Sequence, residues 1–426
     1  MDTASDINIE TQPLPGSGAD SEVLILDEDT RTDLDLFGSD SEAKSLFDFC
    51  NRCRTAGGVK VLRRRMESPW SSAARIRATQ DSVSFILQHR AAFAELPSAY
   101  LTKNVERYFS VGLPMVRQHN VFEFTVGALA LRVNHDSFYT KILQGAKLTS
   151  RLLLAVRTFV REAQIQPPHG ELAPLIEEAQ ALLDRPRLSQ IPNPRTGQWF
   201  WKILRMDQAF RLHERATISR LLQLVYEMDA LVAMADVTHE QGFILPDIEA
   251  GPVQLQATGL VHPLLENAVA NPLELNQDHR VLFLTGPNMA GKTTYLRTVA
   301  TALYLAHLGM GVPAQTFRFV PVQHLLTSKS PSDNLTNGIS YVRAEALRVK
   351  AVARAVADGC RVIAIMDEPF KGTNIKDAFD ASLAILERFA TMDNCLFVVS
   401  SHLIELSERL SETRHVDYQY FEAEEQ

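Results

Sequence analysis

A glycine-rich turn between two apolar segments constrains this chain more than any other feature of its sequence. The turn is GPNMAGKTT at residues 286–294; the β-favouring run 281–285 precedes it, and a helical pattern over 294–308 follows. Glycines let backbone N–H groups converge on one point, and the start of the helix adds the positive end of its dipole. The pattern G-x-x-x-x-G-K-[ST], in this strand–turn–helix context, predicts a loop that binds nucleotide phosphates.

The residues of this loop have separate expected roles. We expect Lys292 to reach the β- and γ-phosphates of ATP and the Thr293 hydroxyl to bind Mg²⁺, so ATP and Mg²⁺ are the predicted cofactors. A chance glycine turn is the alternative interpretation, but it explains neither the lysine nor the helix. The whole turn is expected to contact the nucleotide, namely Gly286, Pro287, Asn288, Met289, Ala290, Gly291, Lys292, Thr293 and Thr294.

A second apolar run, RVIAIMDEP at 361–369, has the composition of a buried strand and ends in two carboxylates. We expect Asp367 to hold Mg²⁺, directly or through water, and Glu368 to polarise the water that attacks the γ-phosphate. A solvated strand end is the competing interpretation, and the phosphate loop favours the catalytic one.

Two further segments are candidates for the same site. CLFVVSSH at 395–402 predicts a third strand, and His402 at its end is expected to sense the γ-phosphate, although a lone histidine is more often structural. The polar loop 331–340 opens a helix expected to run to residue 357. That loop either caps the nucleotide of another subunit or is simply solvated.

The periodicity of the chain predicts its domains. The pattern is helical from Ser41 to about Leu245. The first helix is expected to start at Ser41 and end at Gly57-Gly58, and further helices are expected at 72–93, 137–165, 170–184 and 213–241. After Pro246, short apolar runs alternate with helical stretches, which predicts the α/β fold of P-loop NTPases, a mostly parallel sheet with its chemistry at the carboxyl ends of the strands. The expected domains are an acidic, mostly disordered leader (1–40), an all-α domain (41–249) and an ATPase domain (250–426).

Charge is distributed unevenly along the chain. The net charge is −8, but residues 1–42 contain twelve Asp and Glu and one Arg, which leaves 39 acidic and 42 basic residues elsewhere. The nearly neutral remainder neither supports nor excludes nucleic acid as a partner. Two apolar islands interrupt the leader, 23–26 and 34–37, and we expect a tail with one patch docked on the first helix.

Other classes of protein are disfavoured. The sequence has no apolar run long enough for a transmembrane helix, and its first residues lack the basic and apolar regions of a secretory signal. Four cysteines in 426 residues do not form a disulfide framework. We therefore expect a cytoplasmic protein without a membrane partner.

Beyond these single motifs, the sequence resembles the MutS family of DNA mismatch repair ATPases. TGPNMAGKTTYLR (285–297) is similar to that family's phosphate loop, in which Asn-Met after Gly-Pro is distinctive. SDNLTNGIS followed by Glu345, MDE-(x)3-GT and SSHLIEL occur in the family's order and spacing. Upstream, SLFDFCNRCRTAGGVKVLRRRMESP resembles the start of the family's core domain, and 225–248 resembles its lever helix. The resemblance covers most of 25–422.

The resemblance implies roles that the residues alone leave open. It implies a helical core/lever domain followed by an ABC-like ATPase domain, with Asp367 and Glu368 as the Mg²⁺ and water residues. It makes His402 the family's switch histidine, the residue expected to sense the γ-phosphate. It places Ser340 in a signature loop that reaches ATP on the neighbouring subunit, which implies a homodimer with composite sites and DNA as a partner.

The sequence also departs from the family. From the extent of the resemblance, we expect a protein that begins at the core domain, without the mismatch-reading and connector domains, and that stops short of the segment that usually closes the dimer. Phe122-Glu123-Phe124 superficially resembles the family's Phe-x-Glu wedge, but the spacing differs, so we interpret it as helix packing. DEPFKGTN (367–374) stands where the family has Asp-Glu-Ile-Gly-Arg-Gly-Thr-Ser.

The predicted function is a DNA-binding ATPase of the MutS type, acting in DNA repair or recombination without its own mismatch-reading domain. One alternative is an ATP-driven scaffolding switch that grips a protein, and another is a clamp on branched DNA. A basic run is a candidate for DNA contact, or else a solvated helix face: Arg52, Arg54, Lys60, Arg63, Arg64 and Arg65.

Overall fold

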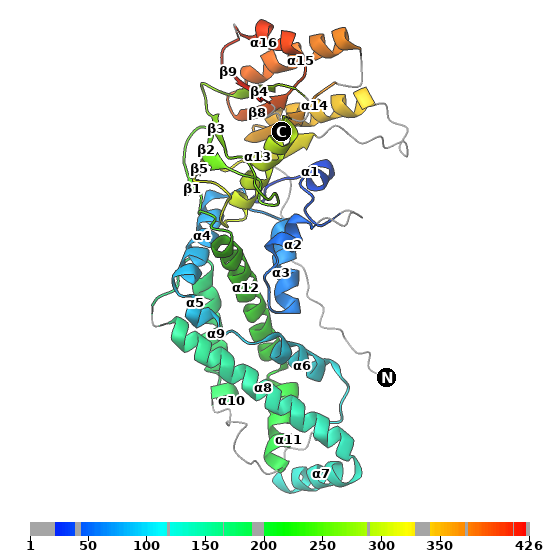
Figure 1. Ribbon diagram of the computed structural model, residues 1–426. Coiled ribbons are helices and arrows are strands. Elements are labelled where there is room, and N and C mark those ends of the chain that lie inside the picture. Colours follow the sequence, from blue (N-terminus) through cyan, green and yellow to red (C-terminus); the bar gives the residue numbers. More distant parts are fainter. Residues whose placement is uncertain are drawn as a thin grey trace. The chain divides into compact units, whose positions relative to one another are not determined.

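The structure is a computed structural model of the 426-residue chain, and it divides into two compact units (Figure 1). The helical unit comprises Arg52–Arg63 and Asp81–Ala233; the α/β unit comprises the described parts of Leu14–Asn51, Arg64–Gln80 and Met234–Gln426. These units do not follow the expected boundaries at 40 and 249, because segments far apart in the sequence pack together. The structure describes residues 22–38, 44–116, 120–164, 166–189, 200–287, 290–328, 341–370, 374–411 and 413–422.

Within the residues that the structure describes, all regular secondary structure of the helical unit is helical. Their buried residues recur at helical spacing, as Leu152, Val156 and Phe159 do in α8, so each helix has an apolar face to pack. Three helices, α3, α4 and α12, also contribute residues to the α/β unit. The helices are α3 (Ala56–Glu67), α4 (Ala73–Gln88), α5 (Arg90–Phe93), α6 (Ala99–Ser110), α7 (Val121–Asn134), α8 (Asp136–Ala163), α9 (Leu172–Leu183), α10 (Pro186–Ser189), α11 (Phe200–Gln208), a π-helical turn (Ala209–His213) and α12 (Arg215–Glu240).

Helix α7 buries one face and exposes another. Phe124, Ala128 and Leu131 are buried, and the helix contacts α8 and α11. Phe122, in contrast, is 76% exposed. The interpretation of Phe122-Glu123-Phe124 as helix packing is therefore confirmed for Phe124 and wrong for Phe122, because the two rings lie on different faces of the helix.

The α/β unit is built on a five-stranded parallel sheet with strand order β6-β7-β8-β4-β9. The apolar runs recognised in the sequence form β4, β7 and β8 in its centre. The phosphate loop follows β4, and the two carboxylates lie at the end of β7. Because these strands are parallel and only β8 lies between them, the loop and the carboxylates are at the same carboxyl edge of the sheet. The strands are β4 (Val281–Thr285), β6 (His324–Ser328), β7 (Val362–Asp367), β8 (Cys395–Ser400) and β9 (Val416–Tyr420).

Helices cover both faces of this sheet. Successive strand side chains point to opposite faces, so Phe283 and Phe397 pack into a core with residues of α14 (Tyr341–Ala357), α15 (Ile375–Ala390) and α16 (Ile404–Leu410). On the other face α13 (Lys292–His307) contacts β6, β7 and β8. This layering confirms the sequence-based prediction of a parallel sheet wrapped by helices.

A second sheet in the same unit was not expected from the sequence. It has strand order β1-β5-β2-β3, and β2 is antiparallel to both of its neighbours. Its strands are short and include polar residues, so the sequence showed no clear strand pattern over them. They are β1 (Asp247–Ile248), β2 (Leu255–Leu260), β3 (Asn271–Leu275) and β5 (Thr316–Phe319).

Part of the expected leader, residues 22–38, folds onto the α/β unit. Ile25 pairs in parallel with the edge strand β6: its N–H donates to the Gln323 carbonyl oxygen (2.8 Å), and its carbonyl oxygen accepts from the Leu325 N–H (3.2 Å). Helix α1 (Glu28–Asp33) follows and contacts β6. The edge strand is thereby covered, which removes its open row of hydrogen-bonding groups.

The second apolar island of this segment lies on helix α2 (Leu46–Cys50). The Phe47 N–H donates to the Leu36 carbonyl oxygen at 2.9 Å, and the ring centroids of Phe37 and Phe47 are 5.9 Å apart. The first helix after the leader therefore does receive an apolar patch, as expected. The other island docks on β6, which the sequence did not indicate.

One member of the basic run has a structural role. Arg54 Nη1 donates to the carbonyl oxygens of Phe93 (3.2 Å) and Ala94 (3.4 Å), where α5 ends and leaves carbonyls without intrahelical partners.

Among the helices that the structure describes, none combines the length and apolarity needed to cross a membrane.

Candidate functional site: the phosphate loop and the Asp367–Glu368 edge

The phosphate loop leaves strand β4 in a conformation that needs glycine at two positions. Gly286 has φ of +138°, and a Cβ at this position would lie 2.3 Å from the carbonyl oxygen of Phe421. Gly291, with φ of +92°, is the N-cap of α13. Asn288 and Met289, which were expected to contact the nucleotide, lie outside the described residues. The described part of the turn connects strand β4 to the N-terminus of helix α13, which is the strand–turn–helix arrangement expected from the sequence.

Lys292 opens α13, and its ammonium group turns back into the loop. Its Nζ donates to the carbonyl oxygens of Gly286 (2.8 Å) and Pro287 (2.9 Å), and the residue is only 5% exposed. A buried ammonium needs such partners, because burial without them is costly. The Lys292 ammonium is thus held inside the loop by the carbonyl oxygens of Gly286 and Pro287.

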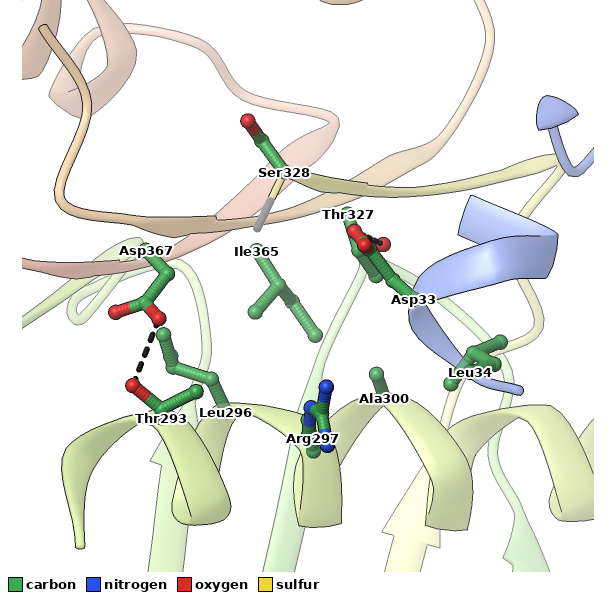
Figure 2. A pocket seen from close by; sticks show the side chains of 10 residues that line it. All are labelled: Asp33, Leu34, Thr293, Leu296, Arg297, Ala300, Thr327, Ser328, Ile365 and Asp367. Atoms are coloured by element: carbon green, nitrogen blue, oxygen red, sulfur yellow. Dashed lines mark hydrogen bonds between the residues drawn. The ribbon is translucent and has the colours of Figure 1, made fainter. Parts of the chain in front are cut away.

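Three oxygen-bearing side chains meet beside the loop, and Figure 2 shows two of them, Thr293 and Asp367. The Thr293 hydroxyl donates to Asp367 Oδ2 at 2.7 Å, and the Ser400 hydroxyl donates to Asp367 Oδ1 at 2.6 Å. Thr293 comes from α13, Asp367 from the end of β7 and Ser400 from the end of β8. Hydroxyl and carboxylate oxygens are the ligands that Mg²⁺ prefers. Thr293 and Asp367, both assigned to Mg²⁺ from the sequence, therefore fit that ion.

Glu368 follows Asp367 in a strained conformation and faces His402. Its φ is +52°, in the left-handed region that non-glycine residues rarely occupy. Its N–H donates to both the carbonyl oxygen and the hydroxyl of Ser400, each at 3.1 Å. Its carboxylate contacts His402 Nε2. The two residues expected to handle water and sense the γ-phosphate are thus in direct contact.

A pocket that is open to solvent begins at this cluster and extends along α13 to the N-terminal segment (Figure 2). Apolar side chains of α13 and β7 form its middle, and Asp33 of α1 lies at the far end. Asp33 accepts from the Thr327 hydroxyl at 2.7 Å. The lining residues are Asp33, Leu34, Thr293, Leu296, Arg297, Ala300, Thr327, Ser328, Ile365 and Asp367.

Two contributors to the site were missed or only partly recognised in the sequence. Ser400 holds both Asp367 and Glu368; the signals for it were the polar pair at the end of the third strand and the SSHLIEL motif, which gave it no role. Glu345 was recognised only through motif spacing, yet its Oε2 accepts from the Phe370 N–H at 2.5 Å. Ser340, the expected signature residue, and the rest of 329–340 lie outside the described residues.

Comparison with protein families agrees with this geometry. Residues 282–426 match the family model of MutS domain V, and residues 29–241 match that of MutS domain III. The first match contains the phosphate loop, the two carboxylates and His402. The second covers α1 except Glu28, and the helices from α2 through α12.

Proposed function

Since the chain belongs to the MutS family, we propose that it is an ATPase that acts on DNA in repair or recombination. The observation that carries the proposal is the joining of Lys292, Thr293, Asp367, Glu368 and His402 at one edge of the parallel sheet. Such an edge, at the carboxyl ends of parallel strands, is where open α/β sheets bind their ligands.

Each of these side chains has a task in ATP hydrolysis. Lys292 would exchange its carbonyl partners for oxygens of the β- and γ-phosphates. Thr293 and Asp367 would hold Mg²⁺, which neutralises the charge that develops on the phosphates. Glu368 orients the attacking water and accepts its proton as the bond from the γ-phosphorus to the bridging oxygen breaks. His402, which contacts Glu368, lies where it would respond to the presence of the γ-phosphate.

The substitution Glu368→Gln tests this assignment. The variant is expected to bind ATP with unchanged affinity and to hydrolyse it about 100-fold more slowly or worse, because a positioned base contributes roughly 10²–10⁴. Single-turnover hydrolysis and a fluorescent-nucleotide titration measure the two quantities. Glu405→Gln, an exposed glutamate on α16, is the matched control and should retain wild-type turnover. Normal turnover of the Glu368 variant would assign the water to another group.

The proposal extends to assembly and to DNA. ATP would join two ATPase units, with Ser340 of each reaching the nucleotide of the other, and hydrolysis would release them. Helices of the helical unit would carry the change to DNA. The family membership supports these steps, and the described residues are compatible with them.

A second candidate function is a switch that grips a protein instead of DNA. One observation favours it: α7 exposes four large apolar side chains at helical spacing, Phe122, Val126, Leu129 and Val133, each at least half exposed. Exposed apolar stripes of this kind are typical of protein contacts. DNA binding at low salt that weakens as salt rises would favour the DNA function, and its absence would favour the switch.

A further inference from the structure

The turn that carries Glu368 contains two strained residues. Glu368 has φ of +52° and Phe370 has φ of +65°, and neither is a glycine. Such backbone costs on the order of 1–3 kcal/mol per residue and persists only where the surroundings impose it. The contacts of this turn must therefore hold it in place.

Each of the two residues is held through its N–H group. Ser400 at the end of β8 accepts from the Glu368 N–H. The carboxylate of Glu345 accepts from the Phe370 N–H at 2.5 Å. Glu345 is 5% exposed, and the Phe370 ring beside it is also buried. A hydrogen bond to a carboxylate is about twice as strong as one between neutral groups, so Glu345 is a strong restraint on the turn.

The helix that carries Glu345 is itself anchored. Arg348, one helical turn further along α14, binds the carboxylates of Asp27 and Asp29 in the N-terminal segment. Other residues of α14 pack against the core of the parallel sheet. Glu345 thus projects from a fixed support, which a positioning group requires.

We propose that Glu345 is a positioning residue for ATP hydrolysis: its carboxylate holds the Phe370 N–H and so keeps the left-handed turn that presents Glu368 beside His402. Glu345 acts through the backbone and needs no contact with the nucleotide. The inference rests on the proposed function and adds to it the group that sets the geometry of the base. A displacement of about 1 Å at a reacting group costs on the order of 100-fold in rate.

The substitutions Glu345→Ala and Glu345→Gln provide the test. The alanine variant removes the acceptor and is expected to lower kcat roughly 10- to 100-fold while the Kd for ATP changes less than about threefold. The glutamine variant keeps a side-chain oxygen acceptor and should recover most of the rate. Lys350→Ala, at an exposed position of the same helix, is the control and should behave as wild type.

A double-mutant cycle separates positioning from a general structural role. If Glu345 acts through Glu368, then Glu345→Ala should slow the Glu368→Gln variant further by less than about twofold, because sites that act as a unit are non-additive. A full additional loss in that background would overturn the proposal, and so would a glutamine variant as slow as the alanine variant. If the alanine variant does not fold by circular dichroism, Glu345→Asp replaces it, since its shortened carboxylate cannot reach the amide; wild-type kcat in that variant would equally overturn the proposal.

Failure of this inference and failure of the proposed function have different signatures. Wild-type protein that hydrolyses ATP, together with Glu345 variants that keep its kcat, overturns the inference alone. Wild-type protein that binds ATP and does not hydrolyse it overturns the proposed function, and the inference with it.

Discussion

Several residues at this site are in unfavourable states, a buried charge or a left-handed backbone, that contacts with neighbouring groups stabilise. The buried ammonium of Lys292 donates hydrogen bonds to two loop carbonyls, which compensate part of the cost of its burial. Glu368 and Phe370 have left-handed backbone, and Ser400 and Glu345 accept hydrogen bonds from their N–H groups. In both cases residues near the phosphate loop are kept in states that cost free energy, which is typical of sites prepared for a ligand.

His307, at the carboxyl end of α13, has a shifted pKa. Its Nδ1–H donates to the Trp70 carbonyl oxygen (2.6 Å), and its Nε2 accepts from the Val322 N–H (3.5 Å). The ring is fully buried, and burial lowers its pKa to about 4. Protonation would place a charge and a second donor against Val322, so the folded protein holds the neutral ring.

We predict a consequence for stability at acid pH. The unfolded chain protonates His307 near pH 6.5 and the folded chain only near pH 4, so the unfolded state binds more protons between these values. The stabilisation is complete above about pH 6.5 and is lost as pH falls through 4, on the order of 3 kcal/mol in total. Denaturant unfolding at pH 7, 5.5 and 4 measures it. His307→Asn cannot titrate and should lose less stability over that range; equal losses would contradict the assignment.

At the scale of elements, α14 joins parts of the chain that are far apart in sequence. It begins directly after the expected signature loop, its Glu345 reaches the Phe370 turn, and its Arg348 binds the N-terminal segment. The same segment covers β6, where the Thr327 N–H donates to the Thr30 hydroxyl at 2.9 Å. The N-terminal segment is thus part of the α/β unit's edge.

Arg348→Ala should therefore loosen this edge. The guanidinium is 9% exposed, whereas Asp27 and Asp29 are more exposed, so solvent screens part of the attraction. We expect a loss of about 1–2 kcal/mol in the free energy of unfolding, and faster proteolysis within 22–38. Arg354→Ala, at an exposed position of the same helix, is the control and should change neither quantity. Unaltered proteolysis of the segment in the Arg348 variant would show that its apolar contacts alone suffice.

At the scale of the whole molecule, the proposed function requires two copies. The resemblance assigns Ser340 to the ATP of a neighbouring subunit. This predicts complementation between two defective variants. One lacks the signature serine, and the other lacks the lysine that neutralises the phosphates.

Ser340→Ala should lower ATPase activity with little loss of nucleotide binding, whereas Lys292→Ala should bind ATP about 100-fold more weakly or worse, on the order of 3 kcal/mol. Mixing the two variants should restore part of the activity, because one composite site then has both intact halves. ATPase rates of the separate and mixed proteins, with mixed dimers verified by mass, measure this. Mixed dimers that regain no activity would exclude a role in trans.

DNA binding by the chain is predicted to be electrostatic. Contacts from helices to phosphates fall steeply with salt and are indifferent to sequence, whereas a mispair is read by side chains wedged into the base stack. We therefore expect a G·T mispair and matched duplex to bind within about threefold of each other, a difference under roughly 1 kcal/mol. Competition binding at fixed salt, with a four-way junction included, measures this. A tenfold preference for the mispair would contradict it, and loss of that preference in Phe122→Ala would identify the exposed Phe122 as the reader.

The sequence by itself determined the phosphate loop, the strands that carry Asp367 and His402, and the layering of a parallel sheet. These features depend on residues close together in the chain, where spacing, periodicity and glycine placement act directly. Only the tertiary structure decided that β8 lies between β4 and β7, which brings Ser400 to Asp367, and that Glu345 holds the Phe370 turn. It alone decided that Thr30 meets Thr327 on the edge strand. Such contacts join residues tens to hundreds of positions apart, and their partners are selected by how the whole chain packs, which no local pattern records.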